Sequence, residues 1–231
     1  MARQITLFFL LLTLMTAGLF PVAAQTPSPT PLFDLTLFLA PPPAQDSAET
    51  KAELAEILKL QKSRTPEMIA AAQADTDESG FAFADVIGGD FTPGKLPLTA
   101  ALLEEVHEAE GALTDPAKDY YHRPRPYVQD TRVQPCVKKS KSFSYPSGHA
   151  TGGTAVAVIL ANMVPEKKDA ILSRGLVYAQ NRVVGGVHYR SDMVAGQRAG
   201  VLLAAGLLRD ESFRKDYEKA RAELRGVLGL K

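Results

Sequence analysis

The sequence predicts an all-α fold, a single-domain helical bundle of about seven to nine helices joined by short loops. Apolar residues recur at helical spacing in several segments, for example at Leu102, Val106 and Ala109. No segment sustains the alternation of apolar and polar residues that marks a strand, and the apolar run "RVVGGV" is short and broken by glycines. The chain has 231 residues and 45% hydrophobic content, which is enough for one sizeable core and little more.

The expected helices follow one another with little chain between them. Asp46 is suited to cap the first helix, whose apolar stripe includes Leu54 and Ile57. Pro66, directly after Thr65, has the position that proline favours at a helix start. The stretches "SGFAF" and "IGGDFTPG" are predicted to form turns around a short helical piece. The remaining helices are predicted at about residues 98–113, 148–163, 166–182, 192–208 and 210–226.

Residues 1–24 have the three parts of a secretory signal peptide. Arg3 supplies positive charge, "ITLFFLLLTL" forms an apolar stretch, and "PVAA" carries small residues where a signal peptidase recognises them. We expect cleavage after Ala24 and a periplasmic or secreted protein, with an uncleaved membrane anchor as the alternative.

Residues 25–45 are rich in proline at both ends and apolar in the middle. We expect an extended N-terminal arm that packs Leu35, Leu37 and Leu39 on the domain, with "PPP" as a stiff turn. Residues 46–231 then form the helical domain.

Charge and composition exclude several kinds of partner. The 26 basic and 26 acidic residues give a formal net charge of zero, which argues against binding a nucleic acid polymer through a broad basic surface. The apolar helices at 148–163 and 192–208 are too short for a membrane span, so we expect no stable membrane insertion after signal removal. Cys136 is the only cysteine, so no internal disulfide can form. The sequence leaves open a homo-oligomer.

Three short stretches concentrate cations, histidine and glycine in a chain otherwise rich in Ala and Leu. They are "KDYYHRPRP", "YPSGH" and "NRVVGGVHYRSD". A helix that starts near Ser147 turns its first amides outward at its positive end, and Gly148 lets an oxyanion approach the backbone closely. The second stretch therefore indicates an anion site, although an ordinary helix cap explains the same residues equally well.

His188 and Asp192 are four residues apart at the start of a predicted helix. Asp192 can accept a hydrogen bond from one ring nitrogen of His188, which leaves the other bare as a nucleophile or base requires; a structural His–Asp pair is the alternative. Two histidines and an aspartate also suit Zn²⁺, but the neighbouring Lys and Arg would repel a divalent cation. If the stretches converge, the pocket is cationic and should hold a phosphate-like dianion, with no metal or other cofactor.

In their order and spacing, the three stretches resemble the signature of the type 2 phosphatidic acid phosphatase superfamily. The exported N-terminus, the "LAPPPAQDS" arm and the "SYPSGH" context are similar to class A bacterial non-specific acid phosphatases over most of residues 36–225. Two departures are visible, since Asn181 replaces the usual serine and Ala150 stands where threonine often follows the histidine. The matching residues are Lys118, Arg125-Pro126, Pro146-Ser147-Gly148-His149, Arg182, His188 and Asp192.

This resemblance implies an exported, metal-independent acid phosphatase that hydrolyses small phosphomonoesters through a phosphohistidine intermediate. It implies that His188 is the nucleophile, that Asp192 holds its ring, and that His149 acts first as general acid and then as base. The phosphoryl oxygens would be bound by the other matched residues, which are Lys118, Arg125, Ser147, Gly148 and Arg182.

Three other functions remain open. A vanadate-dependent haloperoxidase would hold vanadate in the same cationic pocket, and a lipid phosphate or pyrophosphate phosphatase would share the motifs. A non-catalytic phosphate-binding protein would need neither His188 nor His149. Outside the matched residues, we expect His107 to be solvated on a Glu-rich helix face, while His122 and Arg123 are candidates for the pocket edge.

Overall fold

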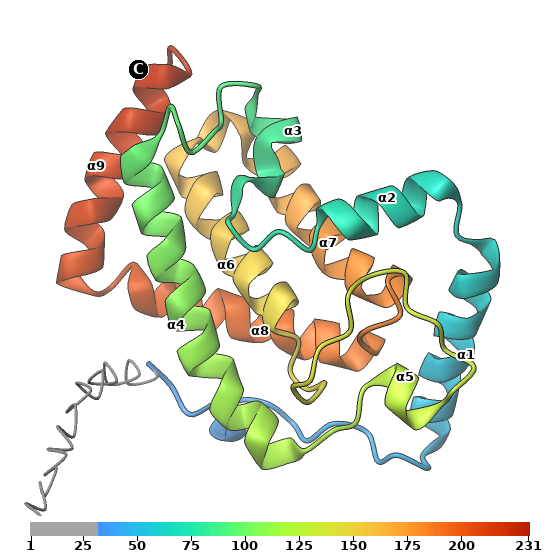
Figure 1. Ribbon diagram of the computed structural model, residues 1–231. Coiled ribbons are helices and arrows are strands. Elements are labelled where there is room, and N and C mark those ends of the chain that lie inside the picture. The colour runs from blue at the N-terminus through green and yellow to red at the C-terminus, as the bar shows by residue number, and fades with distance from the viewer. Residues whose placement is uncertain (1–31) are drawn as a thin grey trace, which may run out of the picture.

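Helix α6 (Gly148–Met163) lies at the centre of the computed structural model, which describes residues 32–231 (Figure 1). Helices α7 (Lys168–Val184) and α8 (Arg190–Leu207) pack against α6, as does α4 (Pro97–Tyr121), and α9 (Glu211–Val227) packs mainly against α4. The all-α prediction is confirmed, and the described residues contain no strand. The other elements are α1 (Ala48–Ser63), α2 (Pro66–Ala74), α3 (Ala84–Ile87), α5 (Pro126–Gln129) and the 3-10 helices Leu35–Leu37, Phe81–Phe83 and Pro165–Lys167.

The composition of α6 explains its central place, because small and apolar residues occupy nearly all of its faces. Ala155, Ile159 and Leu160 have no exposed surface. A helix that is apolar all round is stable in water only where neighbouring helices cover it. Neither α6 nor any other helix within residues 32–231 is long and apolar enough to cross a bilayer.

Helices α6 and α8 cross with their backbones in close contact, and two glycines of α8 permit this. A Cβ atom at Gly196 would lie 2.5 Å from the carbonyl oxygen of Ser147, and one at Gly200 would lie 2.4 Å from that of Thr151. The Ser147 amide accordingly donates a hydrogen bond to the Asp192 carbonyl at 3.1 Å. The amino ends of α6 and α8 therefore lie side by side.

Helix α4 is longer than the sequence predicted, because it continues past residue 113 to Tyr121. Pro116 lies inside it and donates no backbone hydrogen bond. Leu113 and Ala117, on either side of this proline, are buried in the main core, and their packing outweighs the local break. The additional turns place Lys118 on a helix instead of in a loop.

The N-terminal arm differs from the extended form that we predicted. Residues 35–37 form a 3-10 turn that buries Leu35 and leaves Leu37 79% exposed. The prediction that Leu37 packs on the domain is therefore wrong, whereas Leu35 and Leu39 are buried in the main core. The predicted signal peptide and the first residues of the arm lie outside the described residues.

Helix caps agree with the sequence at α2 and differ by one residue at α1. Thr65 caps α2 through its hydroxyl, as the Thr65-Pro66 pair predicted. At α1 the cap is Ser47, whose Oγ accepts a hydrogen bond from the Thr50 amide at 3.1 Å, and not the predicted Asp46. Both residue types are good caps, so the sequence locates the helix start only to within a residue.

Replacing Gly200 by alanine tests the close crossing of α6 and α8. The new Cβ would meet backbone, which cannot turn aside, so Gly200→Ala should lower the free energy of unfolding by about 1–3 kcal/mol in urea denaturation. Gly226→Ala is the matched control, because no atom lies within 4 Å of its Cβ position near the end of α9. That variant should be neutral or gain up to about 1 kcal/mol from helix propensity. Equal effects of the two substitutions would contradict the close crossing.

Candidate active site

A cleft of about 590 Å³ opens where the end of α4, the start of α6 and the turn before α8 meet. Five of the eight predicted site residues line it, although they come from three separate stretches of the sequence. These five are Lys118, Arg125, Gly148, His149 and His188. The cleft thus brings both predicted catalytic imidazoles, two predicted cations and the first residue of a buried helix together. Its lining also includes a third histidine, a third cation and five acidic side chains, so the prediction of a cationic pocket is wrong for the described residues.

His188 is 2% exposed and has a different partner at each ring nitrogen. Its Nδ1 lies 3.3 Å from Oδ2 of Asp192, and its Nε2 lies 3.0 Å from Nη1 of Arg125. A guanidinium can only donate, so Nε2 accepts and the ring proton is assigned to Nδ1. Nε2 therefore carries the lone pair and lies on the side of the ring that faces Arg125.

Burial determines the charge of this imidazole. Desolvation lowers the pKa of His188 to about 3, although the hydrogen bond to Asp192 works in the opposite direction. The ring is therefore neutral throughout the mildly acidic range, and the Nε2 lone pair is not blocked by a proton. An attacking nitrogen must meet this condition.

Asp192 has no exposed surface and accepts hydrogen bonds from several segments of the chain. Nη1 of Arg123 lies 2.5 Å from Oδ1, Oγ of Ser144 lies 2.5 Å from Oδ2, and the Tyr189 amide lies 2.9 Å from Oδ2. Arg123 also donates to the buried Glu53 at 2.9 Å. Arg123, which was a candidate for the pocket edge, thus lies behind the His188–Asp192 pair and holds the aspartate in place.

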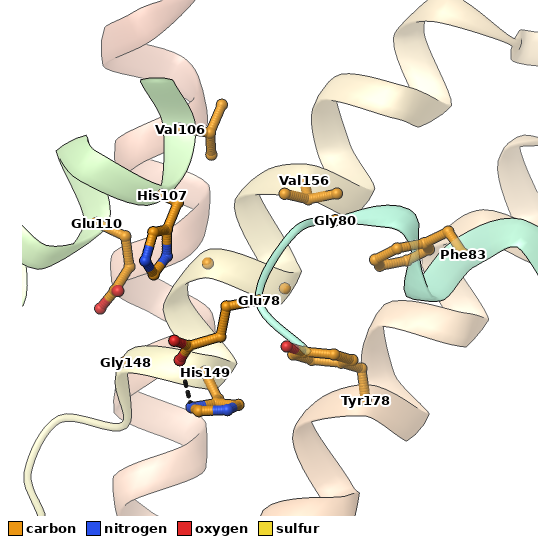
Figure 2. A pocket seen from close by; sticks show the side chains of 12 residues that line it. Glu78, Gly80, Phe83, Val106, His107, Glu110, Gly148, His149, Val156 and Tyr178 are labelled. Carbon is orange, nitrogen blue, oxygen red and sulfur yellow. Dashed lines mark ion pairs between the residues drawn. The ribbon is translucent and has the colours of Figure 1, made fainter. Parts of the chain in front are cut away.

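His149 lines the same cleft and is more exposed than His188. Its carboxylate partner is Glu78. Nδ1 of His149 lies 2.8 Å from Oε1 of Glu78, as the dashed line in Figure 2 marks. The hydrogen bond to His149 is the main cause of a lowered pKa at Glu78. The His149 ring stacks beside Tyr178 at 6.1 Å between centroids, and its Nε2 is buried with no partner among the described residues.

The two cations of the cleft that the sequence predicted are held differently. Arg125 donates to the carbonyl and hydroxyl of Ser142 and to the carbonyl of Val187, which fixes its guanidinium beside His188. Lys118 is 8% exposed and donates to Thr114 at 3.0 Å and to Asp115 at 2.9 Å. Both cations are therefore positioned by contacts within the chain.

Arg182 and Ser147 are not among the residues that line this cleft. Arg182 is 2% exposed and donates from Nη2 to the Ala72 carbonyl, while its Nε has no partner among the described residues. Ser147 is fully buried and caps α6 by accepting a hydrogen bond from the Ala150 amide at 3.3 Å. The structure thus gives Ser147 a helix-capping contact.

The two departures from the family pattern fall behind the cleft. Asn181 donates from its side chain to Asp75 at 2.7 Å, and this carboxylate also pairs with Arg174. The asparagine therefore ties α7 to the end of α2. Ala150 has no exposed surface and belongs to a small buried apolar cluster.

Sequence reasoning missed several residues of the cleft. Glu78 and Glu110 line it, and so does His107, which is partly exposed. No motif includes them, and only the fold brings them to the two histidines. His122, by contrast, is exposed at the end of α4 and does not line the cleft. Within residues 32–231, no group of three or more His, Cys, Asp or Glu residues is arranged to hold a metal ion.

Comparison with known proteins finds one family and several relatives that align over most of this chain. The profile of the PAP2 superfamily matches residues 100–216. An acid phosphatase of Zymomonas mobilis is 35% identical over 201 residues, covering 83% of this chain and 75% of the relative. A non-specific acid phosphatase of Salmonella typhimurium is 32% identical over 206 residues, covering 85% and 82%.

Two solved structures share the fold at low identity. A transmembrane PAP2-type phosphatidylglycerolphosphate phosphatase from Bacillus subtilis matches with a TM-score of 0.50 and 20% identity, covering 75% of this chain and 88% of that one. A bacterial vanadium-dependent chloroperoxidase matches with a TM-score of 0.55 and 12% identity, covering 84% and 54%. At these identities the likeness concerns the helical fold.

Arg123→Met tests whether the buried arginine holds the site together. The substitution leaves the carboxylates of Asp192 and Glu53 buried without their cation, so the free energy of unfolding should fall by about 3–5 kcal/mol. Arg132→Ala is the control, because Arg132 is 74% exposed and pairs with Asp130 at the surface. It should change stability by less than about 1 kcal/mol. Urea denaturation measures both, and a neutral Arg123→Met would contradict the role given to Arg123.

Proposed function

This chain belongs to the PAP2 superfamily and is an acid phosphatase, and on that premise we propose that it hydrolyses small phosphomonoesters through a phosphohistidine at His188, without a metal ion. The observation that carries the proposal is the neutral His188 ring, held at Nδ1 by Asp192 with its Nε2 lone pair beside Arg125. A neutral nitrogen next to a cation is what attack on a phosphoryl dianion requires.

In the first step, Nε2 of His188 attacks phosphorus while the bond from phosphorus to the leaving oxygen breaks. His149 donates its Nε2 proton to that oxygen, so that the product leaves as an alcohol. The imidazole of His188 becomes positively charged as the new bond forms. Asp192, which accepts from Nδ1, stabilises this charge.

In the second step, water attacks the phosphohistidine. His149, now neutral at Nε2, takes a proton from the water as its oxygen bonds to phosphorus and the bond to His188 breaks. Phosphate leaves, and both imidazoles return to their starting states. Glu78 supports both steps, because its contact with Nδ1 of His149 keeps Nε2 as the nitrogen that exchanges the proton.

Arg125, Lys118 and the Gly148 amide are the groups best placed to bind the phosphoryl oxygens. All three residues line the cleft with the two histidines, and Arg125 touches Nε2 of His188. Fixed cations neutralise the charge that spreads over these oxygens during transfer. For Ser147 and Arg182 the assignment to phosphate binding rests on the resemblance, with the unpartnered Nε of Arg182 as a free donor.

The substrates proposed are small phosphorylated molecules, because the groups named grip only the phosphoryl group. The leaving group would lie toward the crevice beside His149, which is lined by Phe83, Val106 and Tyr178 (Figure 2). The signal peptide predicted in residues 1–24 supports export to the periplasm or the medium.

The comparisons favour this function over the two catalytic alternatives. The chloroperoxidase shares only the fold, at 12% identity, and this chain covers 54% of it. A decaprenylphosphoryl-5-phosphoribose phosphatase of Mycolicibacterium smegmatis is 39% identical, but over 79 residues that make up 34% of this chain. The two curated relatives described above, which align over most of the chain at 32–35% identity, are acid phosphatases.

His188→Ala tests the covalent intermediate. Turnover of a phosphomonoester in the presence of EDTA should fall by about a thousandfold or more, because the nucleophile is lost. Mass spectrometry of wild-type protein quenched during turnover should find an added phosphoryl group on the peptide that contains His188. His122→Ala, at an exposed position, is the control and should keep activity. Loss of wild-type activity in EDTA, restored by a divalent cation, would contradict metal independence.

His149→Ala tests the general acid through the leaving group. With an alkyl phosphate, kcat/KM should fall by about 10²–10⁴-fold, because the alkoxide leaves unprotonated. With 4-nitrophenyl phosphate, whose leaving group needs no proton, the fall in kcat/KM should be much smaller. The parameter kcat/KM reports the steps up to formation of the phosphoenzyme and does not include the later attack by water. An equal loss for both substrates would assign His149 to binding and not to proton transfer.

A further inference from the structure

Glu110 is a buried carboxyl group that the mechanism above does not use. It lies on α4, is 6% exposed and lines the same cleft as the two histidines. Its side chain packs against the glycine face of α6, where a Cβ atom at Gly148 would lie 2.6 Å from its Oε1 and one at Gly152 would lie 3.5 Å from its Cγ. Figure 2 shows the Glu110 carboxyl group directed toward the amino end of α6.

Glu110 lies beside two of the groups to which the proposed function assigns the phosphoryl oxygens, Lys118 and Gly148. Its Oε1 and the Lys118 ammonium both lie near the Cβ position of Gly148, at 2.6 and 3.3 Å. Oε1 accepts a hydrogen bond from the Thr114 hydroxyl at 2.7 Å, while Lys118 forms its ion pair with Asp115. A phosphoryl group held by Lys118 and the Gly148 amide would therefore contact this carboxyl group.

The charged groups around Glu110 come from three parts of the chain. Lys118 and His107 are on α4, Glu78 is in the segment before the 3-10 helix Phe81–Phe83, and His149 is on α6. Burial raises the pKa of Glu110, and the charge of Lys118 and the hydrogen bond from Thr114 offset only part of this effect. The carboxyl group is therefore neutral at acidic pH and becomes negative as the pH rises through a value above its usual one.

We propose that Glu110 sets the pH range in which the cleft accepts a tetrahedral dianion. As a neutral acid it donates its proton in a hydrogen bond to a phosphoryl oxygen, and as a carboxylate it repels the same oxygen. The inference rests on the proposed function, since it assumes that the phosphoryl group binds between Lys118 and Gly148. According to this proposal, ionisation of one buried side chain weakens the binding of the dianion as the pH rises.

The probe for this proposal is sulfate, which remains a dianion from about pH 5 to about pH 8, so its own ionisation does not contribute. Calorimetry would compare its Kd for wild type and Glu110→Gln, a variant of nearly the same shape that stays neutral and can still donate. The two Kd values should agree within about twofold at the acidic end. Toward the alkaline end, wild type should bind about tenfold or more weakly than the variant, since like charges a few ångströms apart repel strongly.

A second readout is the number of protons taken up on binding. Near neutral pH, sulfate should draw up to one proton onto Glu110 in wild type, so the total proton uptake should be smaller by that amount in Glu110→Gln, where only other groups such as His149 can contribute. Titrations in two buffers of different ionisation enthalpy measure it. A carboxyl group that only supports the fold would not change it.

Glu108→Gln is the matched control, because Glu108 is an exposed residue of α4 that lines the same cleft and carries the same charge. Glu108→Gln should show neither the pH-dependent difference in Kd nor the decrease in proton uptake. Glu110→Ala is a second variant, which also removes the charge and suits a helix interior. Thermal denaturation establishes that each variant is folded.

Several results would overturn the proposal. A ratio of Kd values that stays flat with pH, or the same change in Glu108→Gln, would remove the special role of Glu110. Failure of both Glu110 variants to fold would show that the carboxyl group is structural and would also overturn it. The phosphatase assay of wild type is separate, so an inactive wild type refutes the proposed function, whereas an active wild type with a flat ratio refutes only the role of Glu110.

Discussion

The rest of the site depends on how the buried charge of Asp192 is satisfied. A carboxylate without exposed surface is stable only with cationic and hydrogen-bonding partners, and Arg123, Ser144 and the Tyr189 amide supply them. These partners come from the segment after α4, the loop before α6 and the start of α8. Arg123 extends the network to Glu53 on α1. The same charge that orients His188 therefore joins four parts of the chain.

The close crossing of α6 and α8 brings His149 to the same cleft as the His188–Asp192 pair. Gly196 and Gly200 let the backbones approach, and the Ser147 amide then reaches the Asp192 carbonyl. Both helices begin at this point, so His149 follows one start and His188 precedes the other. A bulkier residue at either glycine would separate the imidazoles as well as the helices. The same two glycines thus determine both the packing of the core and the geometry of the site.

The sequence could predict those features that depend on residues close together along the chain. Helix α6 was predicted within its observed bounds, and the four-residue spacing of His188 and Asp192 correctly suggested their contact. The predictions of where α4 ends and of a buried Leu37 were wrong, because both depend on tertiary packing. Glu78 and the place of Arg123 behind Asp192 had no local signal, since each acquires its partner only when distant segments meet. The position of Glu110 beside Gly148 likewise depends on the packing of α4 against α6.

His188 and His149 each have a carboxylate at Nδ1, yet the surroundings of the two pairs differ. The charge of Asp192 is already shared with Arg123, so it can orient a neutral His188 without drawing a second proton into a fully buried position. Glu78 has no arginine or lysine among its described ion pairs and is 40% exposed at its side chain, so its charge is available to a protonated His149. In the proposed mechanism, burial and the presence of one guanidinium therefore suit His188 to act as nucleophile and His149 as acid, although the local pairing is the same. The third carboxyl group, Glu110, has neither an imidazole nor an ion-pair partner among the described residues, which is why we propose its protonation as the control on anion binding.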